Sequence, residues 1–187
     1  GDRWPSSLED YYVAYRAMVR AKVACLRAND GTTTEAARAL VGLAARHLVA
    51  GRVRLVLVGG PPATGKTTLA GAIADATGWD VFHSDEVRKE LAGLGPNVAA
   101  AAPLREGIYS DAWGDRTYAA LIARTRELLK RGRTVILDAS WSTEARRDDA
   151  TRLATETKSE LVSFRCEVGP AVAAARASAL FFEPAAS

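Results

Sequence analysis

The sequence has little cysteine and no long apolar run, and each shortage argues against certain classes of protein. Its 187 residues include two cysteines, Cys25 and Cys166, whose spacing matches no metal-binding or redox motif. We expect both to be buried free thiols in a protein from a reducing compartment. No apolar stretch is long enough to span a membrane, and no signal peptide is recognisable. A cytoplasmic protein without a membrane partner is therefore expected.

Net charge is also small, which bears on the choice of partner. The chain has 25 Lys and Arg against 22 Asp and Glu, for a formal net charge of +3. So weak a basic excess is not by itself evidence for binding to nucleic acid. Hydrophobic residues at 48% and charged residues at 25% are ordinary for a globular protein. The length suits one domain with an appendage.

One segment of the chain carries a complete phosphate-binding motif. Residues 60–67 match the pattern G-x-x-x-x-G-K-[ST]. The apolar run 53–58 predicts a strand before the motif, and residues 66–77 predict a helix after it, as the motif requires. The glycines allow successive backbone N–H groups to point at a phosphate, and the helix adds its N-terminal dipole. We expect ATP to contact Gly60, Pro61, Pro62, Ala63, Thr64, Gly65, Lys66, Thr67 and Thr68.

Two side chains of the motif have roles of their own. Lys66 is expected to reach the β- and γ-phosphates and so to act in catalysis, and the Thr67 hydroxyl is expected to coordinate Mg²⁺. The alternative is an ordinary Gly/Pro turn between a strand and a helix. The matching strand and helix patterns on both sides of the motif argue against that alternative.

The rest of the chain alternates between strand-like and helix-like patterns. After the motif helix, strands are predicted over 80–83, 134–137 and 160–166, and helices over 84–91, 110–131, 142–158 and 170–180. Strands separated by helices predict βαβ units, and hence an α/β fold with a parallel sheet and helices on both of its faces. The binding site is then expected at the carboxyl ends of the strands.

The first quarter of the chain lacks any strand pattern. Helices are predicted over 8–28 and 35–50. We expect residues 1–51 to form a helical appendage that belongs to another domain, and residues 52–187 to form the nucleotide-binding domain. The aromatic stripe of the first helix is expected to face a partner surface, and it consists of Tyr11, Tyr12 and Tyr15.

Two of the predicted strands lead into a carboxylate, and the first to consider is Asp138. It follows the apolar strand 134–137 and fits a Walker B acid, which holds Mg²⁺ directly or through water. The alternative is an aspartate that caps a helix or a turn at the end of a strand. The phosphate-binding motif elsewhere in the chain favours the metal-binding role.

The second carboxylate, Asp85, follows the strand 80–83. There it can face the γ-phosphate across the cleft and take the proton of an acceptor hydroxyl. Arg88 lies one helical turn later on the same side and could bind a polar or anionic part of the acceptor. The alternative is that Asp85 forms a helix cap with Ser84, and that Arg88 pairs with Asp85 or Glu86 on the surface.

Three segments together resemble one branch of the phosphate-loop kinases. They are residues 60–68, 83–94 and 135–141. They look like the zeta-toxin-like branch, with its AAA-type ATP-binding domain, which is similar to gluconate kinases, chloramphenicol phosphotransferase and the kinase part of polynucleotide kinase. The likeness runs from about Arg52 to Cys166. It implies a small-molecule kinase that uses ATP and Mg²⁺, with Asp85 as the acceptor base and Arg88 in contact with the substrate.

The flanks of this region carry two further resemblances. Residues 11–28 resemble the last helix of an aminoglycoside-phosphotransferase-like domain, which in bacterial two-domain proteins precedes such a kinase-like domain. This implies a covalently fused N-terminal phosphotransferase-like domain as a partner. After the last predicted strand, Arg176 takes the place of a lid arginine that binds the triphosphate. Residues 177–187 are too few for a full lid and a fifth strand, so we expect either that the domain is truncated there or that a disordered segment is absent from this sequence.

Three functions stay open on the sequence alone. The first is a kinase that transfers the γ-phosphate of ATP to a hydroxyl of a small molecule, such as a sugar or an aminoglycoside-like compound. The second is a polynucleotide 5′-hydroxyl kinase, against which the small net charge argues. The third is an ATP-binding regulatory module of a two-domain protein. Asp85 discriminates among them, because a pure binding module has no use for a base there.

Overall fold

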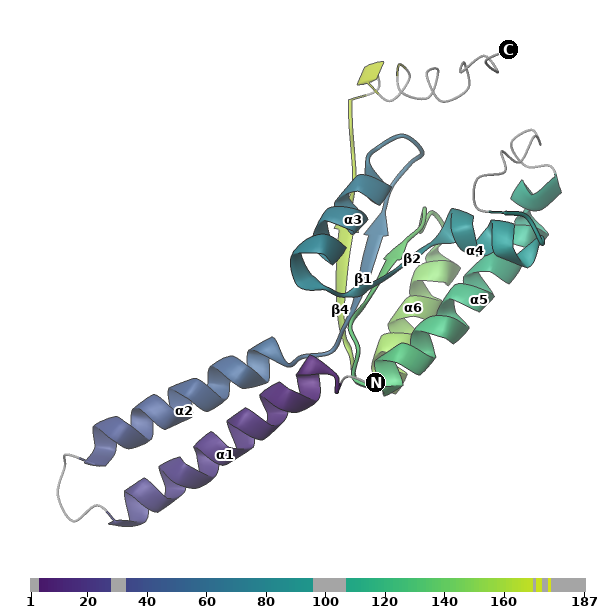
Figure 1. The fold of residues 1–187 in the computed structure, drawn as a ribbon. Coiled ribbons are helices and arrows are strands. Elements are labelled where there is room, and N and C mark those ends of the chain that lie inside the picture. The colour runs from purple at the N-terminus through teal and green to yellow at the C-terminus, as the bar shows by residue number, and fades with distance from the viewer. Residues whose placement is uncertain (1–3, 28–32, 96–106, 170, 173–174, 176–187) are drawn as a thin grey trace. The chain divides into compact units, whose positions relative to one another are not determined.

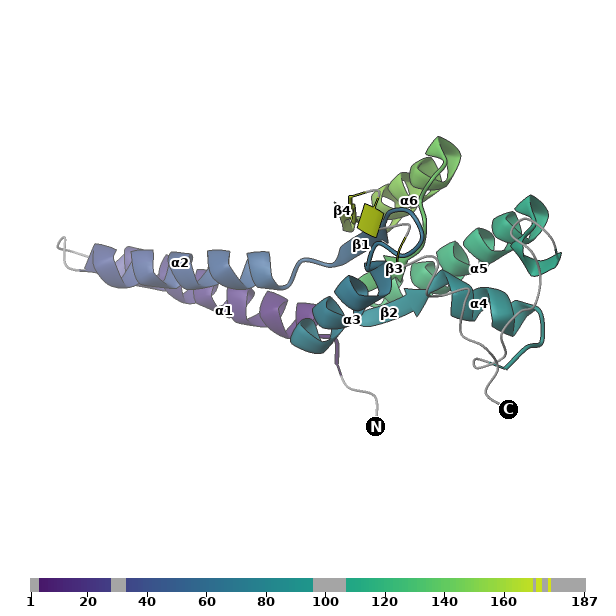
Figure 2. The ribbon, with the colours of Figure 1, turned by 90° about the horizontal axis from the view of Figure 1, so that it is seen from above.

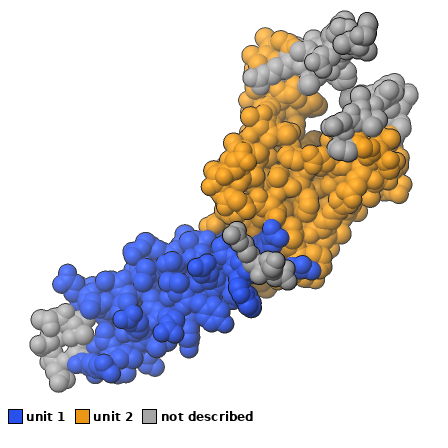
Figure 3. Space-filling view, in the orientation of Figure 1, with its two compact units in different colours: residues 1–53, 131–133 blue, residues 54–130, 134–187 orange. Residues whose placement is uncertain are grey.

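The computed structural model describes residues 4–27, 33–95, 107–169, 171–172 and 175. The chain divides into two compact units, which are residues 1–53 with 131–133 and residues 54–130 with 134–187 (Figure 3). The first unit is built mainly from two helices and the second from a sheet with helices. Each unit has its own internal packing.

The first unit is a helical hairpin whose inner seam consists of alanines. Its helices are α1, Ser6–Arg27, and α2, Thr33–Ala50. Ala14 and Ala17 of α1 form one buried cluster with Ala44 of α2. Because an alanine side chain is a single methyl group, the two helix backbones can approach closely. A contact of 2.7 Å between Nδ1 of His47 and Oδ1 of Asp10 also joins the two helices.

The large aromatic side chains of α1 lie outside this seam. Tyr11, Tyr12 and Tyr15 are each more than half exposed, and the ring of Tyr11 stacks on that of Tyr15. The spacing of apolar residues therefore predicted the helix correctly, while the face that packs within the hairpin is the alanine face. That a partner surface covers the tyrosines stays a prediction.

The second unit is an α/β domain whose strands and helices alternate along the chain (Figure 1). The strands are β1 Arg54–Gly59, β2 Asp80–His83, β3 Val135–Asp138 and β4 Glu160–Arg165. The helices are α3 Lys66–Thr77, α4 Ser84–Leu91, α5 Asp111–Lys130 and α6 Glu144–Thr157, with a 3₁₀ turn, η1 Gly107–Tyr109. The predicted alternation of strands and helices is confirmed for these elements.

The strands form one parallel sheet in the order β2-β3-β1-β4. Strands β1 and β3 are central and almost fully buried, because apolar side chains project from both of their faces. Val56, Val58 and Ile136 pack on one face against Ala70 of α3. Figure 2 shows α3 on one side of the sheet and α6 on the other. The predicted parallel sheet with helices on both faces is confirmed.

The ends of α3 and α4 follow from local chemistry, with one departure from expectation. At the end of α3, Gly78 adopts a left-handed φ of 69° and donates its N–H to the carbonyl oxygen of Ala74 over 2.7 Å. Helix α4 begins at Ser84 itself, and its N-cap residue is His83, which makes no side-chain cap bond. The alternative in which Ser84 caps this helix is therefore wrong, because Ser84 already lies inside the first turn.

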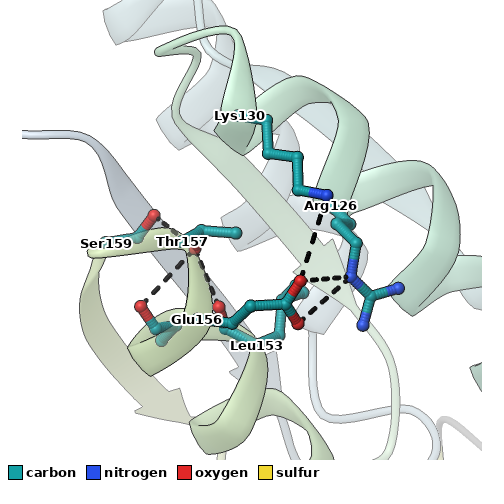
Figure 4. A network of polar contacts seen from close by, with 7 residues as sticks. Arg126, Lys130, Leu153, Glu156, Thr157 and Ser159 are labelled. Carbon is teal, nitrogen blue, oxygen red and sulfur yellow. Dashed lines mark hydrogen bonds and ion pairs between the residues drawn. The ribbon is translucent and has the colours of Figure 1, made fainter.

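A polar network joins α5 and α6 (Figure 4). Both carboxylate oxygens of Glu156 accept hydrogen bonds from Nε of Arg126, at 3.1 and 3.2 Å. At the end of α6, the Thr157 hydroxyl donates to the carbonyl oxygen of Leu153 over 2.8 Å and lies 2.9 Å from the Ser159 hydroxyl. Because the Arg126 and Glu156 side chains are 33% and 47% exposed, solvent screens their ion pair, which contributes at most about 1 kcal/mol.

Cys25 is exposed and Cys166 is partly buried, and both are free. The expectation of a buried thiol is wrong for Cys25, because α1 buries its alanines and leaves this cysteine on an outward face. Arg176 and most of the helix predicted over 170–180 lie outside the described residues. In the part of the chain that the structure describes, every helix is too short or too polar to cross a membrane.

Candidate functional site

The loop between β1 and α3 has a backbone conformation that requires glycine. Gly60 has a φ of 137° and Gly65 a φ of 88°, both in the left-handed region. A Cβ placed on Gly60 would lie 2.4 Å from the carbonyl oxygen of Cys166, so a larger residue does not fit there. The hydroxyl of Thr64 donates to the carbonyl oxygen of Pro61 over 2.8 Å and closes the turn.

This loop leads into the N-terminus of α3. Because the N-cap residue Gly65 makes no side-chain cap bond, the first backbone N–H groups of the helix are left for another acceptor. Such groups attract a phosphate, and the helix dipole adds to that attraction. Ala63 has a φ of 62°, and Pro62, Thr67 and Thr68 are exposed around the start of the helix. The loop therefore has the local geometry of an anion-binding turn.

Lys66, the first residue of α3, folds its side chain back over the loop. Its Nζ donates to the carbonyl oxygen of Pro61 over 2.7 Å. Burial lowers the pKa of Lys66 below its usual 10.5, while the negative charge of Asp138 acts in the opposite direction. The loss of water around the ammonium group thus outweighs the attraction of nearby negative charge. An anionic ligand at the loop would supply the missing counter-charge.

The structure brings Thr67 and Asp138 together. Asp138 ends β3 beside Val58 of β1, and its side chain is almost fully buried. The Thr67 hydroxyl donates to Oδ2 of Asp138 over 2.7 Å. This pair fits Mg²⁺, which uses one or two protein oxygens and completes its coordination with phosphates and water. Within the described ranges, no cluster of three or more acidic, histidine or cysteine residues could hold a metal on its own.

A third side chain, which was not expected from the sequence, lies on the same carboxylate. His83 ends β2 and is the direct neighbour of Asp138 in the parallel pairing of β2 with β3. Its Nδ1 is 2.9 Å from the Asp138 oxygen that Thr67 also contacts. The only signal in the sequence was that His83 ends a predicted strand. The pairing of that strand with β3 could not be read from local patterns.

Asp85 and Arg88 both lie on α4, which starts at the carboxyl edge of the sheet. Nη1 of Arg88 is 3.5 Å from Oδ1 of Asp85, and Nζ of Lys89 is 3.0 Å from Oδ2. The Tyr109 hydroxyl donates to Oδ1 of Asp85 over 3.3 Å. The pairing of Arg88 with Asp85 that formed the alternative thus occurs in the structure, although the Arg88 side chain is only 16% exposed rather than on the surface. The Asp85 side chain is nevertheless 49% exposed, so a ligand can still reach it.

Tyr109 completes this cluster and was also not expected from the sequence. It lies in η1, just before α5, and the guanidinium of Arg88 lies 5.1 Å from the centre of its ring. Burial raises the pKa of the Tyr109 phenol above its usual 10.0, and the negative charge of Asp85 raises it further. At neutral pH the phenol is therefore an uncharged donor to Asp85. No local pattern marked this tyrosine, because its contact with Asp85 is tertiary.

The segment after Asp138 is held in place by α5. The hydroxyl oxygen of Tyr118 accepts the backbone N–H of Trp141 over 3.1 Å and lies 3.1 Å from the hydroxyl of Ser140. The Trp141 ring is buried and meets the Tyr118 ring edge to face, with centres 5.1 Å apart. These contacts fix the backbone that follows the candidate metal-binding acid.

A cavity of about 990 Å³ borders the first half of the loop. Its lining comes from β1, the loop, the segment after β3, helix α6 and strand β4, and includes Gly59, Pro61, Trp141, Arg147, Ser163 and Arg165. Thr67 and Asp138 do not line it, so it lies beside the candidate metal pair rather than around it. On one side it is bounded by β4, the outer strand of the described sheet, whose Phe164 is 44% exposed.

Comparison with known proteins gives a family, a group of relatives in sequence and a solved structure of similar fold. The family described as AAA domain matches residues 55–179. Uncharacterised proteins of Mycobacterium tuberculosis and Mycobacterium bovis are 44% identical to this chain over 168 residues, which is 89% of this chain and 34% of each relative. The chain therefore spans about a third of the length of the curated relatives it matches.

A solved structure from Chloroflexus aurantiacus, described as that of a candidate kinase, has the same fold. It superposes with a TM-score of 0.60 at 21% sequence identity, covering 73% of this chain and 71% of that chain. At this sequence identity the similarity supports the fold alone. The chemistry must be argued from the residues of the site.

Proposed function

This chain belongs to the AAA domain family, and from this premise we propose that it is an ATP-dependent kinase. The proposed reaction transfers the γ-phosphate of ATP to a hydroxyl of a small molecule, such as a sugar or an aminoglycoside-like compound. One observation carries the proposal. Two carboxylates lie at the sheet edge that bears the loop: Asp138, which ends β3 beside Thr67, and Asp85, which lies beside Arg88 in the first turn of α4, directly after the neighbouring strand β2.

On the donor side, the loop and the start of α3 would bind the phosphates of ATP. Lys66 would exchange the carbonyl oxygen of Pro61 for a phosphate oxygen, which makes a stronger, charge-assisted hydrogen bond. Thr67 and Asp138 would hold Mg²⁺, which when bound neutralises negative charge on the phosphates. The buried position of Asp138 keeps its carboxylate away from bulk water.

On the acceptor side, Asp85 would orient the acceptor hydroxyl and receive its proton. As the acceptor oxygen bonds to the γ-phosphorus, the bond from that phosphorus to the oxygen of the β-phosphate breaks and ADP leaves. Lys89 and Tyr109 contact Asp85 in the absence of an acceptor, so the acceptor hydroxyl would replace one of them. Arg88, which lies over the Tyr109 ring, would bind a polar or anionic group of the acceptor.

A regulatory ATP-binding module is the second candidate, and one observation favours it. The Asp85 carboxylate already has partners within the domain, namely Arg88, Lys89 and Tyr109. Such contacts also suit a carboxylate that only stabilises the start of α4 and never acts as a base. In that case ATP would bind without transfer of its phosphate to an acceptor.

The greater length of the mycobacterial relatives bears on the whole protein. We propose that residues 1–51 belong to a preceding phosphotransferase-like domain and that residues 52–187 form the nucleotide-binding domain. Arg176 is kept as a candidate ligand of the triphosphate. The cytoplasmic location stays a prediction.

The proposed function is tested by a phosphoryl-transfer screen on the full-length protein. ATP labelled in its γ-phosphate is offered with Mg²⁺ and with panels of sugars, aminoglycosides and 5′-hydroxyl oligonucleotides. A kinase is expected to transfer the label to at least one small molecule, and the Lys66→Ala variant is expected to transfer far less. Label that stays in ATP or leaves only as inorganic phosphate across the panel favours the regulatory module. Transfer to oligonucleotides indicates a polynucleotide kinase instead.

A further inference from the structure

We propose that His83 is a positioning residue that holds the Asp138 carboxylate in the orientation needed by nucleotide-bound Mg²⁺. The inference rests on the proposed function in one respect, namely that ATP arrives at the loop together with Mg²⁺. It adds a residue of β2 to a metal site otherwise built from the start of α3 and the end of β3. His83 acts through Asp138 and is not itself assigned a contact with metal or substrate.

The geometry of three side chains supports this role. Oδ2 of Asp138 accepts a hydrogen bond from the Thr67 hydroxyl at 2.7 Å and lies 2.9 Å from Nδ1 of His83. The side chains of His83 and Asp138 are 19% and 6% exposed. Water therefore has little access to the contact between them. Thr67 and His83 approach the carboxylate from separate elements, α3 and β2, so together they restrict its rotation.

The donor and acceptor roles follow from the chemistry of the groups. An ionised carboxylate only accepts hydrogen bonds, so the proton of a neutral His83 ring must sit on Nδ1. With two donors on Oδ2, the other oxygen, Oδ1, has no side-chain donor among the described residues. Oδ1 would then be available to the metal or to its bound water. Residues that orient a metal-binding carboxylate in this way commonly change metal affinity when they are replaced.

The position of His83 in the chain gives the contact a second consequence. His83 is the last residue of β2, and α4, which carries Asp85 and Arg88, begins at the next residue. The bond to Asp138 therefore ties the start of the proposed acceptor helix to the proposed metal-binding acid. A change at His83 is expected to act on the metal side first, because its direct contact is with Asp138.

The test compares His83→Leu, which has no donor, with His83→Asn, whose amide can donate from the place of Nδ1. The affinity of the full-length protein for ATP is measured by calorimetry with Mg²⁺ and again with EDTA. His83→Leu is expected to weaken binding with Mg²⁺ by about 10-fold, as for other residues that orient metal ligands, and to leave binding in EDTA unchanged. His83→Asn is expected to restore most of the loss. The matched control is His47→Leu, which removes the similar contact with Asp10 in the hairpin and is expected to change neither affinity.

Each outcome has one meaning. If Mg²⁺ raises the ATP affinity of wild type and of His83→Leu by the same factor, the positioning role is overturned and the proposed function stands. If wild type gains nothing from Mg²⁺, both are overturned. Should His83→Leu fail to fold, nitrogen NMR of the wild-type imidazole rings decides, with the His83 signals identified by their absence from His83→Asn. A proton on Nδ1 that is shared with a carboxylate supports the contact, and a neutral ring with its proton on Nε2 overturns it.

Discussion

The hydroxyl of Thr67 donates a hydrogen bond of 2.7 Å to Oδ2 of Asp138, although 71 positions of sequence separate the two residues. Thr67 opens the helix after the phosphate loop, and Asp138 ends the strand next to the one that leads into that loop. Their contact joins the proposed phosphate-binding turn to a buried acid. That combination suits a magnesium nucleotide better than it suits a phosphate alone.

Replacing Lys66 by alanine is expected to weaken ATP binding about tenfold or more. The reason is the loss of a charge-assisted hydrogen bond to phosphate, worth roughly 1.5–3 kcal/mol. Calorimetry with ATP and Mg²⁺ measures the effect. Lys130→Ala is the matched control. This α5 lysine is 54% exposed, and its ion pair with Glu156 is long, at 4.0 Å. Equal ATP affinities for wild type and Lys66→Ala would contradict the assignment of the loop.

Replacing Asp138 by asparagine is expected to weaken binding of ATP in the presence of Mg²⁺ much more than binding in EDTA. Asparagine keeps the shape of the side chain and removes the negative charge that attracts the cation. Paired titrations with Mg²⁺ and with EDTA separate the two contributions. Equal losses under both conditions would mean that Asp138 only supports the fold, for instance through its bonds with Thr67 and His83.

Replacing Asp85 by asparagine is expected to lower phosphoryl transfer by roughly two to four orders of magnitude, the usual effect of losing a positioned base. ATP affinity is expected to change little, because the polar contacts of Asp85 among the described residues are with Arg88, Lys89 and Tyr109 rather than with the loop. Turnover and calorimetry are measured on the same preparation. Glu86→Gln, on the next and exposed residue of α4, is the control. Transfer by Asp85→Asn at the wild-type rate would remove Asp85 as the base.

The phenol of Tyr109 is expected to ionise above the usual tyrosine pKa of 10.0. Burial raises its pKa first and the Asp85 charge second, so Asp85→Asn should lower the pKa only in part. Near-ultraviolet titration of tyrosinate measures the Tyr109 pKa in wild type and in Asp85→Asn, and Tyr109→Phe identifies its signal. The unfolded chain loses this proton first, so the group adds stability below pH 10 that disappears as pH rises through the folded pKa. A Tyr109 pKa at or below 10.0 would contradict the burial.

Gly60→Ala and Gly71→Ala are expected to change stability in opposite directions. Gly60 has a φ of 137° and no room for a Cβ, so alanine there should cost about 1–3 kcal/mol from backbone strain alone. Gly71 lies inside α3 with nothing within 4 Å of an added Cβ, so alanine should stabilise by about 0.5–1 kcal/mol. Urea unfolding of both variants measures the difference. Equal stability of Gly60→Ala and wild type would show that the loop can rearrange.

Local patterns predicted most of the secondary structure because they act over a few residues. The apolar runs before the loop and before Asp138 predicted β1 and β3, and the spacing of three and four predicted the helices. The same patterns were less informative about packing. Periodicity drew attention to the tyrosines of α1, whereas the hairpin packs through Ala14, Ala17 and Ala44. A periodic apolar face shows that a helix can be buried. Which of its faces is buried depends on the element that packs against it.

The identity of the loop and of the two strand-end acids could be read from the sequence alone, because each is a short segment with its own chemistry. The assembly of the site could not. His83 meets Asp138 across 55 positions, and Tyr109 meets Asp85 across 24. Such meetings depend on which strands pair, in which register, and on which helix covers them. Those choices follow from burial summed over the whole sheet, so only the tertiary structure decided that a strand-end histidine lies on the proposed metal-binding acid.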